Sequence, residues 1–474
     1  MSATYLFYDV ETSGLHKCFD QILQFAAIRT DLQLNEIERH EIFVRLNPDT
    51  IPSPFATITH HIGIEQCQTQ GVSELEAIEK IHNLINTPGT ISLGYNTLTF
   101  DDELLRFAFY RHLLTPYTHQ YANQCGRMDL YPMTTFFALF KPDALPHWPK
   151  IDGRTSLKLE NLNAANHLAT GPAHNALVDV EATIALAKQL KQDEKMWQYL
   201  TGYFHKQTDQ IRCNQLALHP ELQKAIGLMV WGKIGARHQY QAPVLSLGQH
   251  QHYKNQHLWL RLDLPELQQV GLDNVDEHTW VLRKKIGEPG FLLPYQDRYQ
   301  QHIKPERLAQ VESNLNWLTA HPDILAAIIE YHQQFKYPMY PNVDVDAALY
   351  QSDFLSSAER KACADYHHCS TQQKAKWITH CPYPAPQEMA TRVLGRHDAT
   401  ALTPEQQQKF QAYLQRIYSQ NTDEILIDFT NQPRYTLAQF SEDLTDAKTR
   451  DLSAEQQALL QELEAYVAAQ TQGY

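Results

Sequence analysis

The stretch that most constrains this chain lies near its start, where aromatic and β-branched residues lead into two acids and a glycine turn. Residues 4–14 read Thr-Tyr-Leu-Phe-Tyr-Asp-Val-Glu-Thr-Ser-Gly, which is typical of a buried strand. Side chains alternate between the two faces of a strand, so Asp9 and Glu11 point the same way. Two such carboxylates are costly to bury unless a cation binds them, although a solvated strand end would give the same pattern.

Residues 1–195 alternate between predicted strands and helices, which favours an α/β domain. We expect strands at 5–8, 24–30, 41–46 and 90–95, with the first three antiparallel because their connections are short. Helices are expected at 73–85, from residue 101 onward and at 174–190.

Two further zones follow in the sequence. Residues 196–345 carry short β-like runs at 227–234, 257–264 and 279–286, punctuated by Gly and Pro, and predict a small, mostly β domain. Residues 346–474 are rich in Ala, Gln, Glu and Leu. Capping-box spacings at Ser356 and Thr403 indicate that this third domain is all helical.

Composition narrows the class of protein. The net charge of −14 argues against wholesale binding of polyanions but leaves room for a local basic groove. Seven scattered cysteines fit reduced thiols better than a disulfide framework. We find neither an apolar stretch of membrane-spanning length nor a signal peptide, so we expect a cytoplasmic protein that does not contact membranes.

Three residues far along the chain complete a candidate site with the first two acids. Asp101 lies at the start of one predicted helix and Asp179 on another. His174 precedes Asp179 by more than one helical turn, so it should lie on the loop or the first turn. Each residue alone has an ordinary explanation, as a loop histidine or a helix-terminal acid. Together they offer oxygen ligands for two Mg²⁺ or Mn²⁺ ions and one base.

The order of these residues resembles that of the DEDDh family of 3′→5′ exonucleases. The shared motifs are Asp-x-Glu-Thr at 9–12, Asn96 followed by Phe-Asp at 100–101, and His-x-x-x-x-Asp at 174–179. More narrowly, the whole chain resembles the bacterial exodeoxyribonuclease I family, through residues 24–31, 94–96, 100–103, 342–344, 349–350 and 354–356. This resemblance implies an RNase H-like exonuclease domain at 1–195, an SH3-like β-barrel domain at 196–345 and a helical C-terminal domain at 346–474.

The resemblance also implies roles for individual residues. Two Mg²⁺ ions, for which Mn²⁺ can substitute, would be bound by Asp9, Glu11, Asp101 and Asp179, with His174 as the general base. Asp102 is not expected to be a ligand. Further substrate contacts would come from Glu11, Thr12, Lys158, Arg106, Tyr117 and Tyr121.

These substrate contacts differ in kind. Glu11 and Thr12 would contact the 3′-terminal nucleotide. Lys158 falls where the family has an arginine, and it keeps the charge but loses the two-pronged hydrogen bonding. Arg106 is a candidate phosphate contact. Tyr117 and Tyr121 could stack on bases or simply pack within the protein.

The activity implied is 3′→5′ degradation of single-stranded DNA to 5′-mononucleotides in DNA repair and recombination. The implied partners are single-stranded DNA and the C-terminal tail of the single-stranded DNA-binding protein, and the enzyme is expected to be a monomer. Alternatives are an RNA exonuclease of the same fold, which the residues beyond 195 disfavour, and a non-catalytic single-strand-binding subunit, which the intact acidic set disfavours.

Two other clusters carry residues that can bind nucleic acid or metal. Residues 281–286 with Phe291 and Tyr295 mix cations and aromatics, which fits either a groove for single strands or a solvated strand face. Cys363, His367 and the neighbouring His368 and Cys369 lack the spacing of a zinc knuckle, so we expect them on a helix surface.

Overall fold

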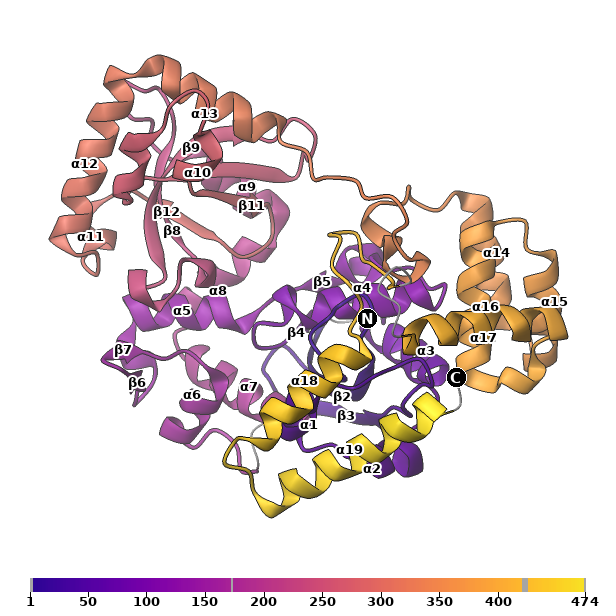
Figure 1. Ribbon diagram of the computed structural model, residues 1–474. Coiled ribbons are helices and arrows are strands. Elements are labelled where there is room, and N and C mark those ends of the chain that lie inside the picture. Colours follow the sequence, from indigo (N-terminus) through magenta and orange to yellow (C-terminus); the bar gives the residue numbers. More distant parts are fainter. Residues whose placement is uncertain (1–2, 172–173, 420–424, 473–474) are drawn as a thin grey trace. The chain divides into compact units, whose positions relative to one another are not determined.

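The computed structural model describes residues 3–171, 174–419 and 425–472, and the chain divides into two compact units (Figure 1). The first unit joins residues 1–127, 169–181 and 338–474, and the second joins 128–168 and 182–337. Each unit therefore gathers stretches that are distant in sequence. The domain boundaries expected after residues 195 and 345 follow the order of the chain instead, and they stay a prediction.

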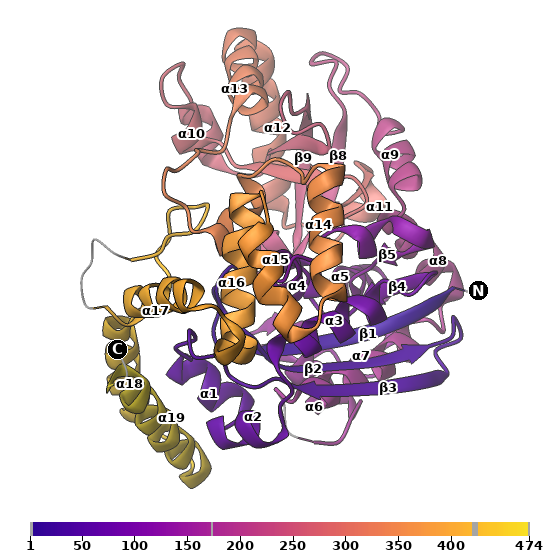
Figure 2. The same ribbon diagram turned by 90° about the vertical axis from the view of Figure 1, so that its right-hand side faces the viewer.

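A five-stranded sheet with β1 at its centre forms the middle of the first unit. β1, β2 and β3 are antiparallel neighbours, as predicted, and Figure 2 shows them side by side. β4 runs parallel to the other side of β1. The sheet order is β3-β2-β1-β4-β5, formed by β1 (Thr4–Thr12), β2 (Ile22–Thr30), β3 (Glu36–Phe43), β4 (Thr90–Leu93) and β5 (Gly126–Arg127).

The third strand begins earlier than predicted. We expected it at residue 41, whereas β3 already starts at Glu36. A tight turn brings the chain back at once, because the Asp31 carboxylate accepts hydrogen bonds from the main-chain N–H groups of Gln33 and Asn35. β3 lies at an edge of the sheet, and its residues are mixed in polarity and partly exposed. The sequence pattern therefore does not reveal where the strand begins.

Helices of the first unit cover this sheet and fix the end of β1. Ser73 caps α3 by accepting a hydrogen bond from the N–H of Glu76 at 3.3 Å. Leu6, Tyr8 and Val10 of β1 share one core with residues of α3 and α4. The helices here are α1 (Pro54–His60), α2 (Ile64–Gln70), α3 (Glu74–Ile85) and α4 (Asp101–Arg111), while α7 (Ala176–Leu190) begins in this unit and continues into the second.

The second unit is built around an antiparallel sheet of five strands. Its order is β11-β10-β9-β8-β12, and the strands are β8 (Ile226–Val230), β9 (Gln241–Gln249), β10 (Gln256–Arg261), β11 (Val281–Lys285) and β12 (Phe291–Pro294). Residues of β9 and β10 form a core with the helices α12 (Pro305–Ala320) and α13 (Pro322–Gln334). This all-antiparallel sheet agrees with the predicted SH3-like domain.

Shorter elements complete the second unit. They are α5 (Leu130–Phe140), the hairpin β6 (Lys150–Ile151) and β7 (Arg154–Thr155), α6 (Leu159–Asn166), α8 (Glu194–Thr201), α9 (Lys206–Asn214), α10 (Val275–His278) and α11 (Asp297–Gln300). The stretch 128–168 thus packs with this unit, although its sequence precedes α7.

The basic and aromatic segment of the second unit does not form an open groove. Lys284 is fully buried, with its ammonium 2.8 Å from the Asp209 carboxylate. Phe291 is fully buried as well, stacked on Tyr203 with ring centroids 4.3 Å apart. The idea of a single-strand groove at 281–295 is therefore wrong for these two side chains, because the fold uses them as core.

The C-terminal part of the first unit is helical, as predicted. Capping boxes form at Ser356 with Glu359 and at Thr403 with Gln406, where the sequence placed them. The helices are α14 (Ser357–His368), α15 (Thr371–His380), α16 (Pro384–Asp398), α17 (Pro404–Tyr418), α18 (Leu437–Lys448) and α19 (Ala454–Gln472). Among the residues that the structure describes, no helix is both long and apolar enough to cross a membrane.

These helices share a core with the start of the chain. Phe19 and Phe107 belong to the same buried cluster as Met389 and Phe410. Cys363, expected on a helix surface, is only 2% exposed and lies in this cluster. His367 binds the Glu79 carboxylate at 2.6 Å, so this histidine joins two parts of the unit instead of forming a metal site.

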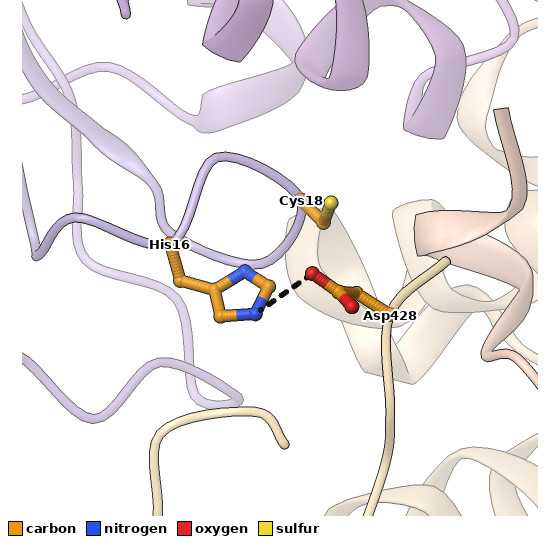
Figure 3. A group of neighbouring side chains, drawn as sticks. All are labelled: His16, Cys18 and Asp428. Carbon is orange, nitrogen blue, oxygen red and sulfur yellow. Dashed lines mark ion pairs between the residues drawn. The ribbon is translucent and has the colours of Figure 1, made fainter. Parts of the chain in front are cut away.

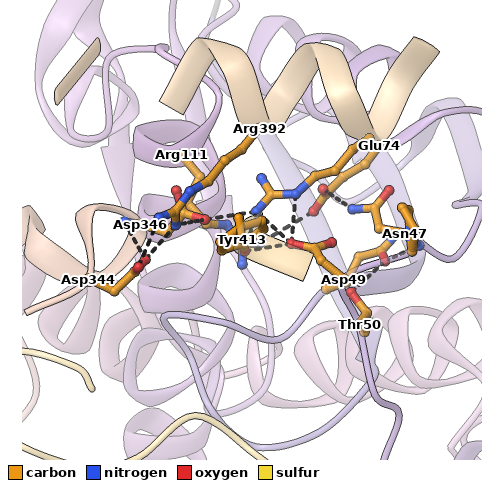
Figure 4. Close-up of polar contacts among 12 residues, drawn as sticks. Asn47, Asp49, Thr50, Glu74, Arg111, Asp344, Asp346, Arg392 and Tyr413 are labelled. Atoms are coloured by element: carbon orange, nitrogen blue, oxygen red, sulfur yellow. Dashed lines mark hydrogen bonds and ion pairs between the residues drawn. The ribbon is translucent and has the colours of Figure 1, made fainter. Parts of the chain in front are cut away.

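A buried network of charges also joins the C-terminal helices to the N-terminal part of the first unit (Figure 4). Arg396 of α16 donates to Asp49 at 2.9 Å and to Asp346 at 2.8 Å, and its side chain is 5% exposed. Burial alone would raise the pKa of Asp346, but the guanidinium groups of Arg392 and Arg396 outweigh it and hold that pKa well below its usual range. Each buried charge in this network depends on its partners.

We expect Arg396→Ala to lower the free energy of unfolding of the first unit by about 3–5 kcal/mol, since it leaves Asp49 and Asp346 buried without that partner. The control is Lys80→Ala, which removes an exposed pair with Glu76 and should cost at most about 1 kcal/mol. Urea unfolding followed by circular dichroism measures both. Equal losses in the two variants would show that the buried network does not hold the C-terminal helices in place.

Candidate active site

The end of β1 presents two carboxylates on one face of the sheet. Asp9 pairs with Ala26 and Glu11 with Gln24 of β2, and the register shifts just after Glu11. Both acids are partly buried, while Tyr5 to Tyr8 before them are fully in the core. The hydrophobic strand therefore fixes where the two charges lie.

Asp179 joins them from the first turns of α7. One carboxylate oxygen from each of Asp9, Glu11 and Asp179 lies within 4.8 Å of the others. Gln24 connects the elements, because its side-chain oxygen accepts from the N–H of Ala176 at 3.3 Å, at the start of α7. The sheet and the helix thus bring together residues 170 positions apart in the way the sequence predicted.

Asp101, the first residue of α4, is buried beside this group. Its charge is among the causes that raise the pKa of both Asp9 and Glu11. It therefore acts electrostatically on the carboxylates of β1, although the three converging oxygens come from the other acids.

The raised pKa values of Asp9 and Glu11 show that burial and mutual repulsion disfavour the charged carboxylates. Burial, followed by repulsion from Asp101, Glu11 and Asp179, raises the pKa of Asp9 well above its usual range. Burial and the charges of Asp179 and Asp101 raise the pKa of Glu11 to about 9. Cations relieve such repulsion, and an all-oxygen donor set suits hard divalent ions such as Mg²⁺ or Mn²⁺. The residues present therefore fit the two-ion site implied by the resemblance.

Asp102, the neighbour of Asp101, has a different role. It is fully buried and forms ion pairs with Arg106 and Arg127 and a 3.0 Å hydrogen bond with His119. Burial raises its pKa, but Arg127 and Arg106 outweigh burial and keep the pKa well below its usual range. As expected from the sequence, Asp102 is not among the converging ligands; it anchors the first turn of α4 instead.

His174 lies on the loop just before α7, one of the two places expected for it, because the helix begins at Ala176 and not at residue 174 as predicted. Its backbone is left-handed, with a φ of 60°, and its side chain is exposed. Burial, together with the charges of His61 and His174, lowers the pKa of His60 to about 4. His174 therefore lies close enough to His60, a residue that lines the cavity described next, for its charge to act on that side chain.

A cavity of about 790 Å³ opens beside Glu11 and Thr12. Its walls include Phe100 and Phe107 from around α4, and Phe429 from the C-terminal part of the chain. The sequence predicted Glu11 and Thr12 as substrate contacts, but it gave no signal for the C-terminal wall, which lies more than 400 residues from them. An aromatic-lined cavity next to the acids has the character of a nucleotide site.

The remaining candidate substrate contacts occupy varied places. Arg106 is 9% exposed, and its guanidinium binds Asp102 and lies 3.3 Å from the Tyr350 hydroxyl, an arrangement that favours a structural role over a phosphate contact. Tyr117 is partly buried beside Arg106. Tyr121 is 67% exposed. Lys158, in the second unit, is exposed with its ammonium 3.2 Å from Glu160.

Comparisons with known proteins agree with this site. Residues 6–187 match the family model described as Exonuclease, and residues 343–470 match that of the Exonuclease I C-terminal domain. Exodeoxyribonuclease I of Escherichia coli K12 is 30% identical over 380 residues, covering 76% of this chain and 78% of that protein.

Solved structures support the fold. The E. coli exonuclease I complex with a dA16 oligonucleotide matches with a TM-score of 0.86 and 24% identity, covering 99% of this chain and 100% of that one. A structure described as SSB/Exonuclease I with the inhibitor CFAM matches with a TM-score of 0.82 and 23% identity, at the same coverage.

The acids at the end of β1, on a sheet of this order, define an exonuclease domain of the RNase H-like class. A helical C-terminal domain and an antiparallel β domain accompany it, as the resemblance implied. With the E. coli relative matched over three quarters of its length, the chain belongs to the exodeoxyribonuclease I family.

The raised pKa values predict how stability depends on pH and metal. Without metal, the folded protein keeps protons on Glu11 that the unfolded chain releases above about pH 4.3, so stability should fall as pH rises towards 9. Divalent ions displace those protons, and added Mg²⁺ should flatten this fall. Melting temperatures from pH 5 to 9, with chelator or with Mg²⁺, measure the effect. Glu11→Gln is the control, and identical pH slopes with and without Mg²⁺ would contradict the assignment.

Proposed function

We propose that this protein removes 5′-mononucleotides from the 3′ ends of single-stranded DNA. The convergence of Asp9, Glu11 and Asp179 within 4.8 Å, on a domain of the exonuclease family, is the observation that carries the proposal. Asp101 completes the acidic set through its charge. We further propose that Mg²⁺ is the natural ion and that Mn²⁺ can replace it.

Each functional residue of the chain has a role in this proposed reaction. Asp9, Glu11, Asp101 and Asp179 would hold the ions. When bound, two divalent ions stabilise the charge that builds on the phosphate and make a water more acidic. His174, exposed and outside α7, would take the proton of the attacking water. Glu11 and Thr12 face the cavity, where they can position the terminal nucleotide.

Membership of this family also suggests which partners the protein binds and in which compartment it acts. We propose single-stranded DNA as substrate and the C-terminal tail of the single-stranded DNA-binding protein as a partner, with support from the relatives' complexes with an oligonucleotide and with SSB. We also propose that the enzyme acts as a monomer in the cytoplasm. All seven cysteines are free thiols, which fits a reducing compartment.

Strands labelled at one end test polarity and substrate together. With Mg²⁺, a 3′-labelled DNA strand should release labelled mononucleotide at once, while a 5′-labelled strand shortens step by step. A duplex and an RNA strand of the same sequence serve as controls, and both should be degraded much more slowly.

Asp9→Asn should abolish cleavage and keep DNA binding measurable. Equal degradation of RNA would favour an RNA exonuclease, and binding without cleavage by the wild type would favour a binding subunit.

His174→Ala should reduce the cleavage rate by about 10²–10⁴, the usual cost of losing a general base, with little change in DNA binding. His368→Ala is a matched control, because His368 is an exposed histidine of the same unit on α14. Single-turnover rates on a 5′-labelled strand measure both. A His174→Ala rate close to that of His368→Ala would remove His174 from the mechanism.

A further inference from the structure

A second group of metal-ligating side chains lies on the wall of the same cavity, apart from the catalytic acids. His16 and Cys18 come from the loop after β1, and Asp428 comes from the C-terminal part of the chain (Figure 3). One ligand atom from each of the three lies within 4.8 Å of the others. Among the described residues, this group and the catalytic carboxylates are the two that meet that condition.

His16 and Asp428 form a long ion pair, and the distance between their two atoms is also the spacing of two ligands on one ion. The His16 Nε2 and Asp428 Oδ2 atoms are 3.4 Å apart, longer than a good hydrogen bond of about 2.7–3.2 Å. Two ligands of one tetrahedral zinc ion, each about 2.0–2.2 Å from it, lie about 3.3–3.6 Å apart. The other ring nitrogen of His16 is buried and has no hydrogen-bond partner among the described residues.

Asp428 is held in place by its own turn. Its Oδ1 atom accepts hydrogen bonds from the N–H and hydroxyl of Thr430, at 2.7 and 2.8 Å, and from the N–H of Gln432 at 2.9 Å. These bonds leave Oδ2 facing His16. A carboxylate oriented in this way resembles a metal ligand that is fixed by its outer contacts.

The loop carrying the other two ligands is also rigid. The N–H of His16 donates to the Asp20 carboxylate at 2.6 Å, and the hydroxyl of Ser13 donates to the same group at 2.7 Å. The carbonyl of Cys18 accepts from the Arg111 guanidinium at 3.1 Å. The three ligands are therefore positioned before any ion binds.

The protonation states of His16 and Cys18 decide which ions can bind here. Burial lowers the pKa of His16, so its imidazole is neutral, the form that binds metals. Burial, and then the charge of Asp428, raises the pKa of the Cys18 thiol. An ion that binds there must displace the thiol proton to solvent, which borderline and soft ions such as Zn²⁺ do and Mg²⁺ does not.

We propose that His16, Cys18 and Asp428 form a binding site for one Zn²⁺-type ion, with water as the fourth ligand. The ion ties the turn around Asp428 to the loop that follows β1. Because Glu11 and Thr12 line the same cavity, an ion here fixes the wall against which the terminal nucleotide is proposed to lie. The site uses none of the catalytic acids, so it stands or falls apart from the proposed function.

Cobalt substitution tests this site in the full-length protein. Asp9→Asn combined with Asp179→Asn serves as the parent, so that the catalytic acids do not compete for the ion. Titration with Co²⁺ should produce the near-ultraviolet charge-transfer absorption of a thiolate–cobalt bond, saturating at one equivalent, and Zn²⁺ should remove it. Cys18→Ala in this parent should abolish the absorption. Cys67→Ala, which removes another buried thiol of the same unit, should leave it unchanged.

A second variant keeps the test decisive if Cys18→Ala does not fold. Asp428→Asn retains the shape of the side chain and should weaken Co²⁺ affinity at least tenfold. Circular dichroism confirms the fold of each variant. Absence of thiolate absorption in the parent, or full absorption and affinity in Asp428→Asn, would overturn the proposal.

Discussion

The structure of the first unit depends on holding together carboxylates that repel one another. Asp9, Glu11 and Asp179 converge, and Asp101 adds its charge from α4, although burial already makes each charge costly. Mutual repulsion raises the pKa of Asp9 and Glu11 further, so the charged form of the cluster is unfavourable without cations. The cluster persists because β1 is a buried central strand whose residues pack against α3 and α4, and because Asp102 anchors the first turn of α4 through two arginines. The hydrophobic core and a fully satisfied buried acid thus stabilise a site that is unfavourable on its own.

The parts of this site that the sequence predicted are those encoded locally or in the motifs shared with the exonuclease family. Alternation along β1 put Asp9 and Glu11 on one face, and helical spacing separated His174 from Asp179. Features that depend on distant partners outside these motifs escaped prediction. Lys284 was expected in a single-strand groove or on a solvated strand face, but Asp209, 75 residues earlier, pairs with it in the core. Cys363 looked exposed because its helix carries polar neighbours, yet its face packs into a core shared with residues from the start of the chain.

That shared core changes how the C-terminal helices are understood. By sequence these helices form a separate zone. In the structure, Arg396 and Arg434 bind Asp49, which precedes them by more than 340 residues, and Phe410 lies in one buried cluster with Phe19. Since Phe429 and Asp428 line the cavity beside Glu11, the helical part supplies a wall of the candidate nucleotide site. The cavity and the acids therefore lie in one compact unit, so a change in the C-terminal helices can alter the site without touching the acids.

Two groups of ligands on one cavity would compete for the same ions unless their chemistry separated them. The acids at β1 offer only oxygen and carry a large negative charge, which favours hard, strongly hydrated ions that also accept phosphate oxygens. His16 and Cys18 are neutral before binding, so this group offers Mg²⁺ only the single carboxylate of Asp428, against several at the end of β1. Binding there requires a bond to sulfur strong enough to displace a proton, and this selects for Zn²⁺-type ions even where Mg²⁺ is far more abundant. The type of ligand atom, more than the distance between the two groups, then decides which ion binds at each group.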